Sequence, residues 1–149
     1  MTTYSEIFGA DLAEYGSELE AVAERAADCT VLVAADGNAI LGAVTYVPGP
    51  ETSMSEFTDT EAAGIRMLVV DPPYQGRGMG KALTDVCIAM ARAEGRQRII
   101  LHTTERQPVA MRMYAGMGFI ATPELDVYMS EPPFSPEEPF RLIAFVLEL

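Results

Sequence analysis

Cysteine is scarce in this sequence: only Cys29 and Cys87 occur, in unrelated contexts. Two isolated cysteines argue against a disulfide scaffold or a metal cluster, so we expect no metal site and two small, buried hydrophobic side chains. No apolar run approaches the roughly 18 residues of a membrane-spanning helix. The segment Met1–Glu6 has neither the basic start nor the apolar core of a signal peptide. These absences predict a cytoplasmic protein with no membrane partner.

Positive charge is also scarce, because 10 Lys and Arg residues stand against 22 Asp and Glu and give a formal net charge of −12. A surface this acidic repels nucleic acids and anionic lipids unless it carries a local basic stripe, and we expect neither as a partner. An acidic field attracts cations. Amines are cations at neutral pH, so the charge agrees with an amine substrate, although plain solubility explains it equally well.

The chain has the length and the pattern of one domain built from helices and strands. Its 149 residues suit a single domain, residues 1–149, that buries a sizeable core. Proline-rich Glu131–Pro139 is expected to be a loop, because proline lacks the N–H that a helix or strand interior needs. Apolar periodicity and turn residues predict, in order, a helix over Asp11–Ala27, strands over Thr30–Ala35, Ala39–Val47 and Ile65–Val70, a helix over Ala82–Glu94, a strand over Arg98–Thr103, a helix over Pro108–Met117, and strands over Leu125–Met129 and Phe140–Leu149.

The segment Gln75–Lys81, which reads Gln-Gly-Arg-Gly-Met-Gly-Lys, is the most informative part of the chain. It joins the strand that ends at Val70 to the helix that begins near Ala82. A glycine-rich turn that opens a helix gathers backbone N–H groups, and the helix dipole adds roughly half a positive charge there. The segment is therefore shaped to bind phosphate.

Two common phosphate-binding motifs do not fit this turn. A Walker loop needs four residues between its first glycine and its Gly-Lys pair, and then Ser or Thr for magnesium. Here three residues separate Gly76 from Gly80, and Ala82 follows Lys81. The dinucleotide fingerprint G-x-G-x-x-G needs a different glycine spacing and an acidic residue about 20 positions on for the ribose. The residue nearest that place, Glu94, lies inside the predicted helix.

A third motif fits. Gln75–Gly80 matches the Q/R-x-x-G-x-G/A signature of the GNAT superfamily of acyl-CoA-dependent N-acetyltransferases. Upstream, Met67–Pro72 resembles the central strand of that family and its exit. Downstream, Ala110–Phe119 resembles the second signature, A-x-x-x-Y-x-x-x-G-F. Both motifs in this order, about 35 residues apart with a predicted strand between them, make the resemblance specific over roughly Thr30–Phe119.

The resemblance implies an α/β (α+β) fold: a mixed, mostly antiparallel sheet with a central, splayed pair of parallel strands, flanked by helices. Family members usually begin with a strand and two helices before the hairpin, whereas only about 29 residues precede it here. The N-terminal strand and part of a helix are therefore expected to be absent or shortened. A neighbouring subunit could supply the substrate wall that they usually build, which would make the protein a homodimer.

The resemblance also implies acetyl-CoA as the co-substrate. Its pyrophosphate would lie on the glycine turn, where basic side chains add charge-assisted contacts, and Gln107 takes the place of a cofactor-binding Asn. Its pantetheine arm would pair with the backbone of Leu68 and Val70, and an N–H of Val69 or Val70 would face the thioester oxygen. The expected cofactor-binding residues are Leu68, Val69, Val70, Gln75, Gly76, Arg77, Gly78, Met79, Gly80, Lys81 and Gln107.

The resemblance makes Tyr114 the first candidate for catalysis. Its hydroxyl would lie near the CoA sulfur and protonate the departing thiolate. A phenol, with an ordinary pKa near 10, holds its proton at neutral pH. The alternative is a core tyrosine between helix and sheet, and the position in the motif favours the catalytic role.

The general base is less sharply indicated. His102, the only histidine, lies at the end of a strand beside the expected splay, and histidine suits proton transfer at neutral pH. A structural role for it is equally open. Glu105 and Glu61 are the alternative bases, and Glu56 and Asp59 in the acidic loop could bind a cationic substrate.

Two functions survive these exclusions. The first is an N-acetyltransferase that acts on a small-molecule or peptide amine by direct attack in a ternary complex, since neither cysteine belongs to the signatures. The second is a catalytically weak acyl-CoA-binding module that acts as a sensor or interaction partner. Gln107 in place of Asn and the short N-terminal region favour the second function, and Tyr114 and the intact glycine turn favour the first.

Overall fold

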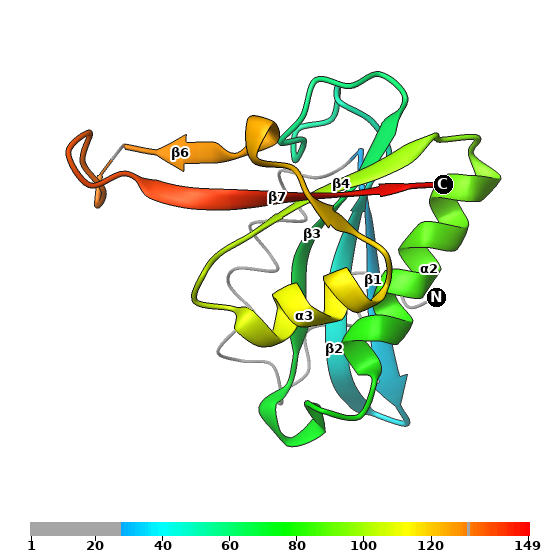
Figure 1. Ribbon diagram of the computed structural model, residues 1–149. Helices are drawn as coiled ribbons and strands as arrows, with labels where there is room; N and C mark the ends of the chain where they lie inside the picture. The colour runs from blue at the N-terminus through cyan, green and yellow to red at the C-terminus, as the bar shows by residue number, and fades with distance from the viewer. Residues whose placement is uncertain (1–27, 131) are drawn as a thin grey trace.

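The computed structural model describes residues 28–130 and 132–149, which form a sheet with two α-helices packed on it (Figure 1). The predicted helix over Asp11–Ala27 and the expected N-terminal shortening lie outside the described residues. The elements are β1 (Thr30–Asp36), β2 (Ala39–Val47), β3 (Ala62–Val70), the 3-10 turn η3 (Pro72–Tyr74), α2 (Met79–Ala93), β4 (Arg98–Thr103), α3 (Pro108–Gly116), β5 (Ile120–Ala121), the 3-10 turn η4 (Pro123–Leu125), β6 (Val127–Met129) and β7 (Phe140–Glu148).

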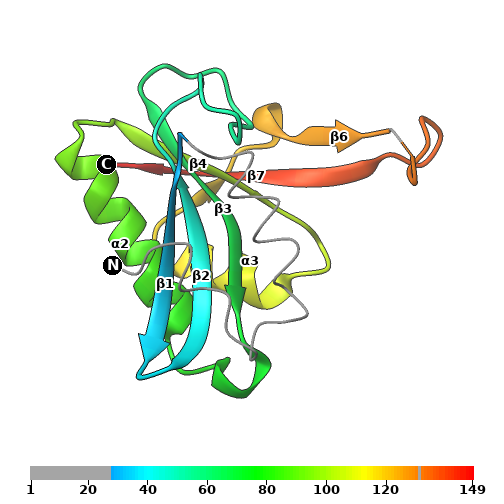
Figure 2. The same cartoon turned by 180° about the vertical axis from the view of Figure 1, so that it is seen from behind.

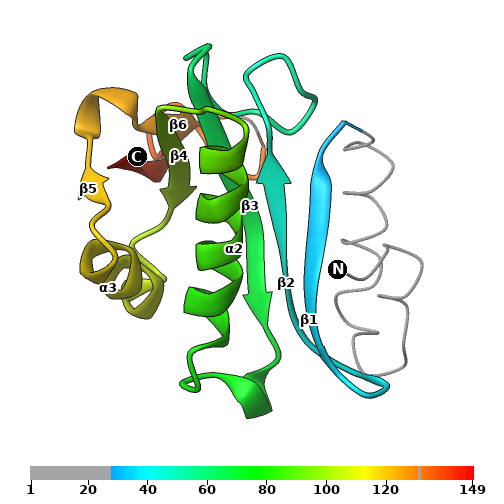
Figure 3. The ribbon, with the colours of Figure 1, turned by 90° about the vertical axis from the view of Figure 1, so that its right-hand side faces the viewer.

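The strands lie in the order β1-β2-β3-β4-β7-β5, and β6 pairs with β7. Every pair is antiparallel except β3 and β4, which run parallel. The expected mixed, mostly antiparallel sheet with a central parallel pair is therefore confirmed. Both helices cover one face of the sheet (Figure 2), and α2 lies along β3 (Figure 3). Neither described α-helix has the length and apolarity needed to cross a membrane.

The main core fills the space between the sheet and the helices. The buried face of α2 presents Leu83, Cys87, Ile88 and Ala91, at the i, i+4 spacing that an amphipathic helix requires. These side chains pack against alternate residues of the strands, because successive strand side chains point to opposite faces. The strand members of this cluster are Leu32, Val44, Tyr46, Ala63, Ile65, Ile99, Leu101, Ile143 and Phe145.

The parallel pairing of β3 with β4 is short. It runs from Ala62 opposite Arg98 to Ile65 opposite Leu101, and the two strands then separate. A central strand is usually buried on both faces, but residues 66–70, the second half of β3, are only half-buried. These residues have no neighbouring strand on the side of β4, because β4 separates from β3 after Ile65. This separation is the splay expected from the sequence.

A β-bulge changes the sheet face to which the last side chains of β3 point. Met67 has a φ of 55°, and the pairing of β3 with β2 shifts register there, so that Met67 and Leu68 together lie opposite Val44. One extra residue moves every following side chain to the other face. As a result Leu68 and Val70 face the side covered by the helices, whereas Met67 packs against Met54 on the opposite side.

The C-terminal strands form an arm. β6 and the first half of β7 extend away from the rest of the sheet (Figure 1). The strand predicted over 125–129 is shorter than expected, because Pro123 opens a 3-10 turn through Leu125 and only Val127–Met129 pairs with β7. β5 was not predicted, since two residues carry no periodicity; its pairing with β7 defines it. Residues 132–139 form the expected loop.

Candidate functional site

The glycine turn leads from β3 into α2. The side-chain amide of Gln75 donates to the carbonyl of Val70 at 3.0 Å and holds the turn against the strand end. Gly76 and Gly78 have φ values of 77° and 81°. Other residues adopt this left-handed region only with strain, so the glycines are what allows the chain to turn here.

The first turn of α2 has no side-chain cap. Gly78 is the N-cap, no side chain bonds to the free amides, and no acidic residue lies in the first turn. The N–H groups of Met79, Gly80 and Lys81 therefore lack the partners that most helices supply. Uncapped amides at the positive end of a helix dipole bind anions, above all phosphate.

A cavity of about 640 Å³ opens beside these amides, bordered by the end of β3 and the first turns of α2 and α3. Nine of the eleven predicted cofactor residues line it: Leu68, Val70, Gln75, Gly76, Gly78, Met79, Gly80, Lys81 and Gln107. The structure adds six more, namely Tyr74, Arg106, Pro108, Val109, Ala110 and Met113. A Cβ at Gly80 would lie 3.3 Å from the sulfur of Met113, so glycine lets the two helices approach at this point.

Lys81 and Arg106 line the rim, Arg77 lies next to the lining residues Gly76 and Gly78, and all three cations are in weak pairings. The Nζ of Lys81 lies 2.8 Å from Asp85, with both side chains half-exposed. The guanidinium of Arg77 lies 5.7 Å from the ring centre of Tyr74, and that of Arg106 lies above Phe140. Exposed pairs of this kind contribute at most about 1 kcal/mol. Each cation can therefore reorient toward an anion at little cost.

The backbone N–H and C=O groups at the end of β3 point alternately to its two sides. The carbonyl of Val69 points to β2, where a Cβ on Gly42 would lie only 2.8 Å from it. Because backbone groups alternate along a strand, those of Leu68 and Val70 point to the side that β4 has left. Of the two N–H groups predicted to face a thioester, that of Val70 is therefore the better placed.

Tyr114 lies in the core, 5% exposed. Its ring centre is 5.5 Å from that of Phe119 and 6.4 Å from that of Phe145. Burial, with a smaller effect of Cys87, raises the pKa of Tyr114 to about 12. The phenol is neutral at physiological pH, and Tyr114 is not among the residues that line the 640 Å³ cavity.

A second cavity, of about 580 Å³, lies on the sheet face away from the helices. Its floor is formed by Ile100 and His102 of β4 and by Val146 and Glu148 of β7. The loop after β2 and the segment around η4 form its walls. These walls contribute Glu56, Phe57, Thr58, Asp59, Ile120, Thr122, Glu124, Leu125 and Asp126, and Arg98 completes the border.

His102 is held in this second cavity with its side chain 2% exposed. Its Nε2 lies 2.9 Å from the carbonyl oxygen of Leu125. Its Nδ1 lies 3.9 Å from an oxygen of Glu56, and the same oxygen is 3.0 Å from Nε of Arg66. A histidine in contact with a carbonyl and a carboxylate can accept and pass on protons.

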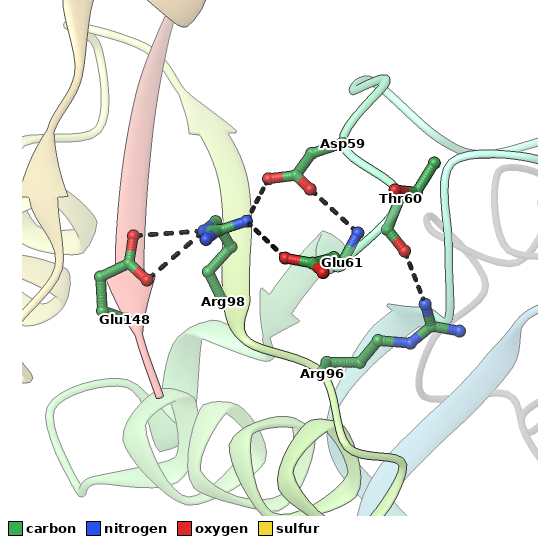
Figure 4. A network of polar contacts seen from close by, with 6 residues as sticks. All are labelled: Asp59, Thr60, Glu61, Arg96, Arg98 and Glu148. Atoms are coloured by element: carbon green, nitrogen blue, oxygen red, sulfur yellow. Dashed lines mark hydrogen bonds and ion pairs between the residues drawn. The ribbon is translucent and has the colours of Figure 1, made fainter.

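The alternative bases lie in ion pairs. Glu105 is 75% exposed and lies 3.7 Å from Arg141. Glu61 is 4.0 Å from Arg98, which also pairs with Asp59 at 2.7 Å (Figure 4). Within residues 28–130 and 132–149, neither glutamate lines either of the two cavities, so the geometry favours His102.

Asp126 fixes the wall of the second cavity. Its carboxylate accepts hydrogen bonds from the Arg141 guanidinium at 2.7 Å and from the N–H of Ala144 at 2.8 Å. Burial alone would raise the pKa of Asp126, but these two donors outweigh it, so the pKa lies below its usual range. The contact holds η4 against β7 and so keeps the Leu125 carbonyl on His102.

A family model, that of the acetyltransferase (GNAT) family, matches residues 2–119, which is most of the chain. The chain belongs to the GNAT family. The resemblance drawn from the glycine turn and the second signature is thereby confirmed.

Curated relatives of this GNAT chain include a mycothiol acetyltransferase from Cellulomonas flavigena. It is 36% identical over 104 residues, which are 69% of this chain and 29% of the relative. N-acetyltransferase 8F1 from Rattus norvegicus is 32% identical over 92 residues, covering 60% of this chain and 39% of the relative. The matched part thus spans well under half of each relative.

Solved GNAT structures share the fold. A Bacillus subtilis acetyltransferase in complex with CoA matches with a TM-score of 0.67 and 18% identity, covering 100% of this chain and 95% of that one. A GNAT acetyltransferase from Elizabethkingia anophelis with acetyl-CoA bound matches with a TM-score of 0.65 and 18% identity, covering 87% and 82%. At such identities the likeness shows the fold alone.

Sequence reasoning missed the α3 side of the first cavity and the place of Arg66 beside Glu56. No motif marks Arg106 or Met113, and only the packing of α3 against α2 brings them to the rim. The position of Arg106, one residue before Gln107, was the available signal. Arg66 lies within a strand whose apolar neighbours gave no hint of a polar site.

Proposed function

We propose that this chain transfers the acetyl group of acetyl-CoA to a primary amine, with both substrates bound at once. The observation that carries the proposal is the 640 Å³ cavity, in which the uncapped turn of α2 meets the strand edge that β4 has left. The turn offers amides to a pyrophosphate, and the free edge offers backbone groups to an amide-containing chain. CoA carries both groups.

The first cavity would hold CoA by its polar groups. The amides of Gly78 to Lys81 would bind the pyrophosphate, and Arg77 and Arg106 would reach it from the rim. Gln107 accepts a hydrogen bond from the hydroxyl of Thr103 at 2.9 Å. Its carbonyl is thus occupied, and its NH₂ group is the end that can donate to the cofactor.

The transfer forms an N–C bond and breaks a C–S bond. The amine loses one proton to a base and attacks the thioester carbon, while the N–H of Val70 stabilises the developing oxyanion. One such donor typically contributes ~3 kcal/mol to the transition state. The C–S bond then breaks, and the thiolate takes a proton from Tyr114. The phenolate recovers the second proton that the amine nitrogen releases.

A catalytically weak acyl-CoA-binding module is the second candidate, and the burial of Tyr114 favours it. The ring contacts two phenylalanines, and Tyr114 does not line the first cavity. If its hydroxyl does not meet the sulfur, the chain would bind acyl-CoA and turn it over slowly.

Calorimetry with CoA and a thiol-release assay with acetyl-CoA and a panel of primary amines separate these functions. The proposal expects CoA binding together with amine-dependent thiol release. Binding without release on any amine would favour the binding module. Absence of CoA binding would contradict both.

A further inference from the structure

Arg66 and His102 are the first residues beyond the last parallel pair, Ile65 with Leu101, and they lie on the two strands that separate. Both side chains point to the sheet face away from the helices and meet one carboxylate. Glu56 lies 3.0 Å from Arg66 and 3.9 Å from His102. It therefore bridges the mouth of the gap through which a thioester bound in the first cavity would reach this face.

The ring of His102 has a defined hydrogen-bonding state. A carbonyl oxygen can only accept, so the contact of Nε2 with Leu125 at 2.9 Å places the hydrogen on Nε2. In the neutral ring Nδ1 is then an acceptor, and it faces a second acceptor, the carboxylate of Glu56. A donor between these two groups satisfies both, and the N–H groups of an ammonium are such donors.

The rest of the second cavity selects for charge and shape. Its apolar surface comes from Phe57, Ile100, Ile120, Leu125 and Val146. Among the described residues that line it are five carboxylates, and the only Lys or Arg is Arg98, which is already shared between Asp59 and Glu148 (Figure 4). An amine on an apolar body fits this lining, whereas a ligand carboxylate would find no free cation.

We infer that the acceptor is a primary amine on an apolar body, without a carboxylate beside the nitrogen, and that Glu56 and Nδ1 of His102 bind its ammonium group. This inference rests on the proposed acetyltransferase function. Glu56 attracts and orients the cation, and Nδ1 removes one proton. The freed lone pair then forms the N–C bond, and the C–S bond breaks afterwards. The thiolate takes its proton from Tyr114, which recovers the second proton of the amine nitrogen, and His102 later returns the first proton to solvent.

A matched pair of amines tests the substrate class. We expect kcat/KM for 2-phenylethylamine to exceed that for phenylalanine by roughly 100-fold, because the added carboxylate would enter a lining with five carboxylates and would find no free cation there. Hexylamine should also be acetylated, since it offers an ammonium on an apolar body. Equal or better activity on phenylalanine would overturn the inference, and so would acetylation that is confined to hydrophilic amines.

Substitutions test the two groups. Glu56→Gln should raise KM for the amine at least about tenfold, the loss expected for a hydrogen bond to a charge, with little change in kcat. His102→Gln should lower kcat and remove the rising acid limb of its pH profile. The charged groups that face the ring are Glu56 from the loop after β2 and Asp126, the residue that follows η4, and each is held by an arginine. Glu137→Gln, on the exposed loop, is the charge-matched control and should change neither constant.

CoA affinity distinguishes this inference from the proposed function. Both variants should bind CoA as the unmodified protein does, because Glu56 and His102 line the second cavity and not the first. An unchanged KM in Glu56→Gln, or a retained acid limb in His102→Gln, would overturn the inference while acetyl transfer stands. If the unmodified protein did not bind CoA at all, the proposed function itself would be wrong.

Discussion

Single side chains in this protein take their chemistry from what encloses them. Tyr114 and His102 are both almost fully buried. Tyr114 is packed against two phenylalanine rings, and its burial disfavours the phenolate and raises its pKa to about 12. His102 meets a carbonyl and a carboxylate instead. One residue is therefore suited to keep a proton and the other to receive one.

The role of Tyr114 can be tested by removing one oxygen. Tyr114→Phe keeps the ring contacts with Phe119 and Phe145 and removes the acid, so we expect kcat to fall by ~100-fold or more. CoA affinity, measured by calorimetry, should stay within about twofold, because a transition-state contact adds nothing to ground-state binding. A collapse of CoA affinity with little change in kcat would assign the hydroxyl a structural role.

At the scale of elements, the site depends on two irregularities at the C-terminal end of β3. The bulge at Met67 turns Leu68 and Val70 toward the first cavity. The turn that follows uses glycine where the backbone is left-handed. Regular strand or helix geometry at either place would close the cavity or hide its amides.

Gly78→Ala and Gly116→Ala make a matched pair for the glycine turn. Gly78 has a φ of 81°, so alanine there should lower the free energy of unfolding by about 1–2 kcal/mol and weaken CoA binding. Gly116 ends α3 with open space around it, so alanine there should leave stability unchanged or raise it by up to about 1 kcal/mol. Chemical denaturation and calorimetry measure both effects, and equal losses in the two variants would contradict the assignment.

At the scale of the whole molecule, the buried weak acids set the response to alkali. Burial raises the pKa of Cys87 to about 12, and it raises the pKa of Tyr114 to about 12 as well. Burial and the hydrogen bond to Glu94 also raise the pKa of Tyr46. The unfolded chain therefore loses these protons at lower pH than the native state does, and the net effect favours unfolding as pH rises.

We expect the free energy of unfolding to fall steadily between about pH 9 and pH 12, by ~1.4 kcal/mol per pH unit for each group that is ionised only in the unfolded chain. Urea denaturation at a series of pH values measures this slope. Tyr114→Phe serves as the control, because it should reduce the slope above about pH 10 and leave it unchanged below. A flat profile up to pH 12 would show that these groups are not buried in solution.

Much of the fold and of the first cavity could be predicted from local signals. Periodicity located both described helices and most strands, and the glycines of the segment 75–81 marked the tight turn, because the left-handed backbone at Gly76 and Gly78 leaves a mark in the residue type itself. Three features could not be predicted from local signals: the length of β6, the existence of β5 and the burial of β3. Each depends on which neighbour covers an edge, and a short segment does not encode its neighbours.

The sequence by itself determined the family, the glycine turn and the identity of the chemical groups. Only the tertiary structure decided where β3 and β4 separate, which backbone groups face the gap, and that Glu56, Arg66 and Leu125 converge around His102. These contacts join segments far apart in the chain. Residue types set what a side chain can do, whereas strand register and packing set what it meets, and register is a property of the assembled sheet.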